Sequence, residues 1–182
     1  MTDFASTRKA FHLPEGIIYL DGNSLGPMPV AAAEKVAAMM RDEWASMLIT
    51  GWNKAGWYHQ PRRVGDRLAR LIGAGPGEVV MGDTLTIKVF QALSAALRLN
   101  PGRRVILSDS GNFPSDLYTA EGLGRAVGAE LRIVAPDEVE AAIDDSLSVL
   151  MLTEVDYRTG RRHDMAALTA RAHAAGALTV WD

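Results

Sequence analysis

The sequence predicts an α/β fold in which a mostly parallel sheet is covered by helices. Short apolar runs that are rich in β-branched residues alternate along the chain with longer helical runs. The later short runs are almost wholly apolar rather than alternating, which is typical of parallel strands buried on both faces. This order of elements is the one expected of strand and helix units in a layered α/β domain.

Each element is predicted from its local composition. The strands are the short apolar runs, and several of the helices open at Pro, Ser, Thr or Asp and close before Gly. The predicted strands are residues 78–81, 104–107, 131–134, 148–152 and 177–181. The predicted helices are residues 31–44, 62–72, 85–97, 115–122, 136–143 and 165–174.

Composition and charge exclude several classes of protein. The 182 residues carry 22 acidic and 19 basic side chains spread along the chain, a net charge of −3, so no basic face is expected for nucleic acid or anionic lipid. The absence of cysteine excludes disulfides, thiolate metal sites and a cysteine nucleophile. Because no signal peptide and no membrane-length apolar run is present, we expect a cytoplasmic protein that contacts neither nucleic acid nor membrane.

The last predicted strand is followed by a single residue, Asp182. A parallel strand needs a covering helix, and without one the apolar face of the sheet would be bare. We therefore interpret the sequence as a fragment of a longer chain.

Polar residues that follow the predicted strands are the first candidates for a binding site, because ligands of such sheets bind beyond the carboxyl ends of the strands. Thr84, Leu85 and Thr86 open a helix after the first strand and could offer backbone amides and a hydroxyl to a phosphate. A plain helix cap explains the same residues equally well.

Three further strand ends carry candidate residues. Phe113 and Asp116 share a loop, where the ring could stack on a flat cofactor or simply pack ahead of a capped helix. Asp182 could pair with a protonated pyridine nitrogen or remain a solvated carboxylate. Thr153 could bond a cofactor oxygen or satisfy a backbone group at the strand end.

The other motifs of the sequence do not indicate a function. The glycines of residues 73–77 follow a helix and precede a strand, the reverse of the dinucleotide-binding order, so they predict a turn. The four histidines show no metal-ligand spacing, and no serine-hydrolase or phosphate-loop motif is present. Residues 161–164 are predicted to be a solvated turn before a helix.

Six segments that occur in the same order resemble kynureninases, and together they extend the resemblance over residues 11–182. They are residues 19–27 (YLDGNSLGP), 51–57 (GWNKAGW), 82–86 (GDTLT), 110–118 (SGNFPSDLY), 152–160 (LTEVDYRTG) and 180–182 (VWD).

The resemblance implies an aspartate-aminotransferase-like fold with a large domain that binds pyridoxal 5'-phosphate. Residues 1–50 would contribute to the small domain and to dimer contacts, and residues 51–182 would be the first part of the large domain. Kynureninases are homodimers that hydrolyse L-kynurenine or 3-hydroxykynurenine to anthranilate or 3-hydroxyanthranilate and L-alanine, in tryptophan breakdown.

The resemblance also implies roles for residues at matching positions. Leu85 and Thr86 would bind the cofactor phosphate, and Phe113 would stack on the pyridine ring. Thr153 would contact the cofactor oxygen, and Asp182 would pair with the pyridine nitrogen. The same side of the pocket would be completed by Pro114, Ser115 and Asp116, and the substrate pocket would include Ser24 and Trp52.

The chain departs from the family pattern in three respects. Glu154 replaces a histidine and Lys88 replaces an asparagine, and each new charge would alter the surroundings of the cofactor. The lysine that forms the Schiff base in kynureninases belongs to a later motif, which none of the four lysines of this chain matches. We therefore expect the chain alone to be inactive. The alternatives are another enzyme of the same fold type, such as a cysteine desulfurase or an aminotransferase, and a non-catalytic fragment.

Overall fold

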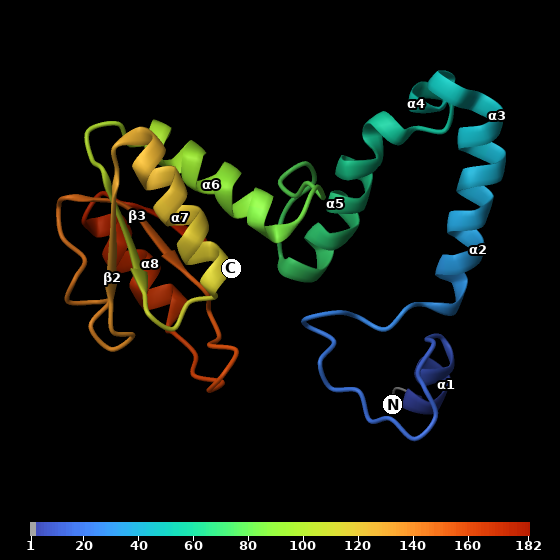
Figure 1. Ribbon diagram of the computed structural model, residues 1–182, viewed down its shortest axis with the longest axis horizontal. Coiled ribbons are helices and arrows are strands. Elements are labelled where there is room, and N and C mark those ends of the chain that lie inside the picture. Colours follow the sequence, from blue (N-terminus) through green and yellow to red (C-terminus); the bar gives the residue numbers. More distant parts are fainter. Residues whose placement is uncertain (1–2) are drawn as a thin grey trace. The chain divides into compact units, whose positions relative to one another are not determined.

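The computed structural model describes residues 3–182. The chain divides into two compact units, Met1–Met81 and Gly82–Asp182, and Figure 1 labels most of their helices and strands. Within the described residues, no helix combines the length and the apolar character that crossing a membrane requires.

The second unit contains a parallel sheet of four strands in the order β2-β1-β3-β4. The strands are β1 (Val105–Asp109), β2 (Glu130–Val134), β3 (Leu147–Leu152) and β4 (Leu178–Trp181). The chain runs from β1 to β2 on one side and then returns to β3 on the other side of β1. The strand order therefore reverses between β1 and β3, and such a switch point opens a crevice at the carboxyl ends of the strands.

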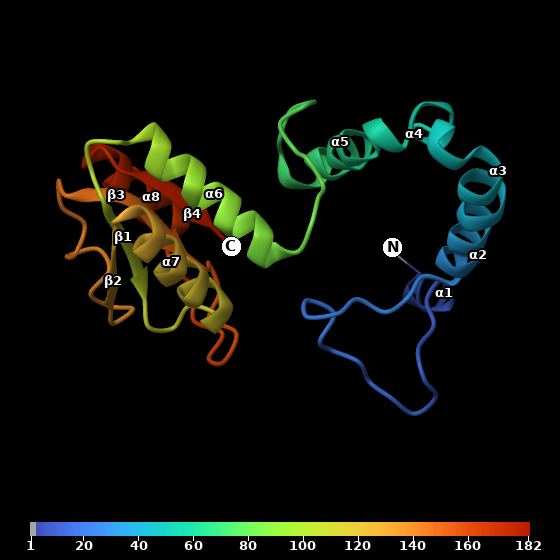
Figure 2. The same cartoon turned by 45° about the horizontal axis from the view of Figure 1, so that its top comes forward.

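Helices cover both faces of this sheet. On one face, α6 (Leu85–Leu99) and α7 (Pro114–Val127) pack on Ile106, Val149 and Met151, and Figure 2 shows these two helices side by side. On the other face, α8 (Met165–Ala174) packs on the strands through Leu168 and Ala172. This double cover explains why β1 and β3 are buried along their whole length.

The helices of this unit begin and end at residues with the expected chemistry. Thr84 caps α6 by accepting a hydrogen bond from the Ile87 amide at 3.5 Å, and Asp164 caps α8 by accepting one from the Ala167 amide at 3.0 Å. Helix α7 starts with Pro114 and ends at Gly128, whose φ of 70° favours glycine.

The first unit is a succession of short helical segments. Of its described residues only Gly51, Gly65 and Ala69 are buried. The segments are α1 (Phe4–Lys9), α2 (Val30–Ala38), the π-helix η1 (Met39–Trp44), α3 (Ala45–Met47), the 3₁₀-helix η2 (Leu48–Thr50), α4 (Gly51–Lys54), the 3₁₀-helix η3 (Trp57–His59) and α5 (Gln60–Ile72).

Two predicted elements are wrong. Residues 78–81 form no strand, because the Met81 amide bonds the carbonyl of Pro61 and the Val79 carbonyl lies against Gly65 of α5. Residues 136–143 form hydrogen-bonded turns instead of a helix, although Val139 and Ile143 are buried as a helical pattern requires. A segment this short depends on its surroundings, since a helix needs a costly first turn.

Candidate functional site

The loop after β1 is held by side chains at the end of that strand. The Asp109 carboxylate accepts a hydrogen bond from the Gly111 amide at 2.7 Å. The Asn112 amide group donates to the Ser108 hydroxyl at 2.9 Å, and its carbonyl oxygen accepts from the Phe113 amide at 2.7 Å. These bonds fix the backbone from which the Phe113 side chain projects.

Thr153 connects this loop to the ends of β3 and β4. Its hydroxyl donates to the Asn112 carbonyl oxygen at 2.6 Å and lies 3.4 Å from a carboxylate oxygen of Asp182. A hydroxyl has one proton, so the shorter contact is the stronger hydrogen bond. Asn112, Thr153 and Asp182 are thus neighbours at the switch point, although 70 residues separate the first from the last.

Asp116 and Asp182 form a pair of carboxyl groups at this edge of the sheet. Asp116 lies in the first turn of α7 and is only 1% exposed. Burial and then the negative charge of Asp182 raise the pKa of Asp116 to about 6, while the Ser115 hydroxyl opposes the rise. Among the described residues, neither carboxyl group forms an ion pair with a basic side chain.

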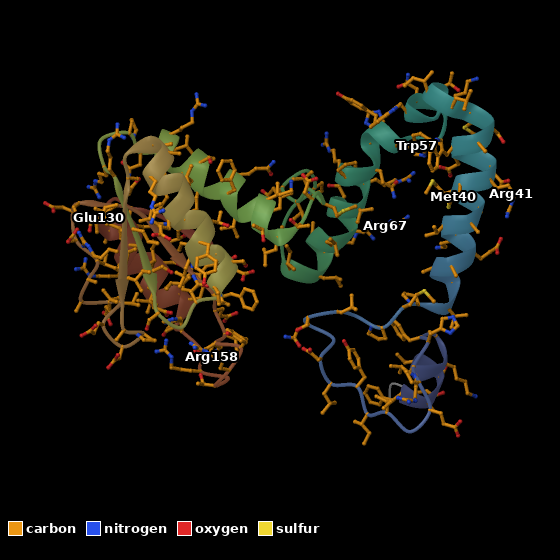
Figure 3. The ribbon with its side chains drawn as sticks, viewed as in Figure 1. Met40, Arg41, Trp57, Arg67, Glu130 and Arg158 are labelled. Carbon is orange, nitrogen blue, oxygen red and sulfur yellow. The ribbon has the colours of Figure 1, made fainter. Side chains whose placement is uncertain are left out.

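Phe113 presents an accessible aromatic ring beside these carboxyl groups. The ring is 45% exposed and packs edge-to-face against Tyr157, with 5.1 Å between ring centroids. The guanidinium of Arg158, labelled in Figure 3, lies 5.4 Å from the centre of the Tyr157 ring. The exposed part of Phe113 suits contact with a flat molecule.

The start of α6 lies in the same unit and offers backbone donors. The amides of Leu85 and Thr86 belong to the first turn, so they have no acceptor within the helix. Lys88, which follows them, donates to the Gln91 side chain at 3.0 Å and lies 3.9 Å from Asp83. The positive end of the helix dipole and this lysine together favour an anion.

Glu154 follows Thr153 and is half-buried. Its backbone amide donates to the carbonyl of Asp182 at 3.0 Å, and its side chain lines a cavity of about 830 Å³. Glu154 therefore adds a further acidic residue beside the end of β4.

The remaining candidates belong to the first unit. Ser24 lies in an exposed loop, where its amide donates to the Asp21 carbonyl at 3.2 Å. Trp52 packs edge-to-face against Trp57 at 6.2 Å, and both line a cavity of about 780 Å³. The indole of Trp57, labelled in Figure 3, donates to the Glu43 carboxylate at 2.6 Å. The predicted site residues of the second unit are Leu85, Thr86, Phe113, Pro114, Ser115, Asp116, Thr153 and Asp182.

His163 is a residue of this region that the sequence did not predict. Residues 161–164 were expected to be solvated, but His163 is 8% exposed and its Nε2 lies 2.6 Å from the Asp109 carboxylate. The prediction is wrong at this residue because it considered only neighbours in sequence. His163 and Asp109 are 54 positions apart, and no spacing rule joins them.

Comparison with known proteins gives close relatives over almost the whole chain. Kynureninases of Pseudomonas fluorescens, Deinococcus radiodurans and Burkholderia pseudomallei are 53%, 50% and 49% identical to it, in each case over 98% of the chain. The chain is homologous to the amino-terminal portion of kynureninases. It spans 44%, 45% and 44% of the length of these three kynureninases. No protein-family model matches the sequence.

Solved structures agree with the kynureninase homology at the level of the fold. A NifS-like protein, 14% identical, superposes with a TM-score of 0.65 over 82% of this chain and 44% of its own. DndA from Streptomyces lividans, 20% identical, superposes with a TM-score of 0.66 over 85% of this chain and 46% of its own. The predicted aspartate-aminotransferase-like α/β fold is thereby confirmed.

Proposed function

We propose that this chain is part of a kynureninase, a hydrolase that uses pyridoxal phosphate to split L-kynurenine, or 3-hydroxykynurenine, into anthranilate, or 3-hydroxyanthranilate, and L-alanine. The sequence identity of about 50% to kynureninases, over 98% of the chain, supports the assignment. The observation that carries it is the pair of carboxyl groups of Asp116 and Asp182. The pair lies beside Thr153, at the same edge of the sheet as the Phe113 loop.

The chemistry of this edge of the sheet fits pyridoxal phosphate. Two neighbouring carboxyl groups without a basic partner among the described residues favour a group that brings a positive charge, such as a protonated pyridine nitrogen. The exposed Phe113 ring suits a flat aromatic ring, and the free amides of Leu85 and Thr86 suit a phosphate. When bound, pyridoxal phosphate withdraws electrons from the α-carbon of an amino-acid substrate.

We assign the carboxyl groups different tasks. Asp182 would keep the proton on the pyridine nitrogen, because an adjacent carboxylate stabilises the cationic form of that nitrogen. Asp116, which is buried in the first turn of α7, would make the electrostatic potential around Asp182 more negative once the cation is present. Thr153 would fix the position of the Asp182 carboxylate relative to the Asn112 side chain.

Two residues of the first unit are candidates for contacts with the substrate. Ser24 and Trp52 are proposed to contact the substrate, and residues 1–50 to contribute to the small domain and to dimer contacts. Exposed apolar side chains of this unit, such as Ile49 and Leu71, suit surfaces that become covered in a larger assembly. We therefore propose a cytoplasmic homodimer as the functional form.

We further propose that this chain alone does not catalyse the reaction. Its lysines, Lys9, Lys35, Lys54 and Lys88, do not match the lysine motif of kynureninases. A lysine that bonds the cofactor covalently would have to come from chain outside residues 1–182.

The test is an assay of the protein purified from its source cells, with L-kynurenine as substrate and the fluorescence of anthranilate as readout. We expect anthranilate to form, and Asp182→Asn to lower kcat/KM at least 100-fold, whereas Asp145→Asn on an exposed loop should keep the wild-type value. Sulfide release from L-cysteine without any anthranilate would reject the proposal in favour of a desulfurase.

A further inference from the structure

We propose that His163 is a positioning residue, which holds the two loops that carry Phe113 and Tyr157 in register beside the proposed cofactor site. The inference rests on the proposed function for what the loops hold, but the contacts that carry it belong to the chain itself. They begin with a bond between His163 and Asp109.

The bond between His163 and Asp109 is short and buried. Nε2 of His163 lies 2.6 Å from Oδ2 of Asp109, and the two residues are 8% and 3% exposed. A carboxylate only accepts, so this bond requires the proton on Nε2, and the Arg161 guanidinium, 3.1 Å from the same nitrogen, then finds no acceptor there. The Arg161 guanidinium lies 3.5 Å from the same oxygen, so it adds a positive charge to the carboxylate side of the pair.

The other oxygen of Asp109 belongs to the loop after β1. Oδ1 accepts the hydrogen bond of the Gly111 amide at 2.7 Å, so this single carboxylate joins His163 to the loop that leads into Phe113. Gly111 lies close to the carboxylates of both Asp109 and Asp156. A Cβ atom at this position would lie 2.9 Å from the Asp156 carboxylate and 3.1 Å from Asp109.

Asp156 connects the same contact to the loop that carries Tyr157. Its carboxylate accepts hydrogen bonds from the amides of Arg158 at 2.8 Å and Thr159 at 3.1 Å. Its backbone amide donates to the Arg161 carbonyl at 2.8 Å, and the His163 amide donates to the Glu154 carbonyl at 2.9 Å. The hairpin of residues 155–162 is thus closed at its base by the backbone amide of His163, next to the bridge between Val155 and Arg162.

His163 also contacts the end of β4. Its ring lies 6.4 Å from the ring of Trp181, which immediately precedes Asp182. The Trp181 indole in turn donates to the Thr169 hydroxyl of α8 at 2.9 Å. The imidazole therefore contacts the supports of Phe113 and of Asp182, and the backbone amide of the same residue bonds the base of the loop that carries Tyr157. His163 itself is not among the residues proposed to touch the cofactor.

Three variants of the chain separate this role from general stability. His163→Leu removes the donor, whereas His163→Gln keeps an N–H that can reach Asp109. His173→Gln, at an exposed position near the end of α8, is the matched control. Two readouts are measured on each: hydrogen exchange of residues 109–113 and 154–162, and affinity for pyridoxamine 5'-phosphate, which has no aldehyde to react with surface lysines.

We expect His163→Leu to accelerate exchange at least tenfold in both loops while β3 stays protected, and to weaken pyridoxamine phosphate binding at least tenfold. His163→Gln should recover most of both losses, and His173→Gln should behave as the wild type. Unchanged exchange in residues 109–113, or a His163→Gln variant as impaired as His163→Leu, would overturn the proposal. If exchange responds as expected but the wild type binds no pyridoxamine phosphate, the positioning of the loops stands and the proposed cofactor is rejected.

Discussion

Asp116 is a buried carboxylic acid whose pKa is higher in the folded chain than in the unfolded chain. Burial and the charge of Asp182 raise its pKa from 3.8 to about 6. Between these two values the folded chain binds a proton that the unfolded chain has released, so the free energy of unfolding falls as pH rises through this window. A shift of this size corresponds to a loss on the order of 3 kcal/mol at neutral pH.

Asp116→Asn should remove that pH dependence, because the amide resembles the neutral acid and has no proton to lose. We expect the variant to be more stable than the wild type at pH 7.5 and equal to it near pH 4. Urea unfolding followed by circular dichroism across this range measures the difference. Asp145→Asn, at an exposed position, should reproduce the wild-type slope. A slope that persists in Asp116→Asn would show that another group causes it.

Much of the candidate site could be predicted at the residue scale, because the carboxyl ends of parallel strands meet at one edge of a sheet. Thr153 and Asp182 were predicted from that rule and lie 3.4 Å apart. The bridging role of Asn112 and the bond between His163 and Asp109 were not predicted. Both depend on the register between neighbouring strands and loops, which local composition does not encode.

At the scale of single elements, α7 contains two glycines in opposite surroundings. A Cβ atom on Gly124 would lie 2.7 Å from the carbonyl oxygen of Ala129, whereas one on Gly122 would meet nothing within 4 Å. Gly124 is buried and Gly122 is exposed. The first glycine is therefore required by close approach of the backbone after the helix, and the second is not.

Alanine at these two positions should have effects of opposite sign. Gly122→Ala should stabilise the chain by roughly 0.5–1 kcal/mol, since alanine favours the helix. Gly124→Ala should destabilise it by about 1–3 kcal/mol, because the backbone at Ala129 must move. Thermal unfolding of the two variants measures both changes in stability. Equal changes would mean that the backbone at Ala129 moves without a cost in free energy.

The elements that were predicted correctly are those with strong local signals. Helix α8 begins at its Asp164 cap, and β3 is apolar except for Ser148. The sequence predicts the helix at its observed bounds and the strand to within one residue. The two elements that were predicted wrongly have weak or misleading local sequence signals. Residues 78–81 are apolar but bond to α5, and residues 136–143 have the helical burial pattern but form only turns.

At the scale of the whole molecule, apolar burial is concentrated in one of the two units. Both hydrophobic core clusters belong to residues 82–182, and the described part of the first unit buries only two glycines and one alanine. Amides with little apolar cover open at low free-energy cost. The stabilities of the two units should therefore differ widely.

Hydrogen exchange of this chain should reveal that difference directly. We expect amides of residues 3–81 to exchange at least 100-fold faster than those of β1 and β3. The same amides should exchange more slowly where the proposed dimer covers the first unit. Equal protection in the two units of the isolated chain would contradict this account of its stability.

We propose that the carboxyl ends of β1, β3 and β4 form a pyridoxal phosphate site in which Asp182 pairs with the pyridine nitrogen. Calorimetric titration of the chain with pyridoxamine 5'-phosphate tests it most directly. We expect one molecule to bind per chain, with an affinity that Asp182→Ala weakens at least tenfold and that Asp145→Ala leaves unchanged. Equal affinity of the wild type and Asp182→Ala, or no binding to the wild type, would contradict it.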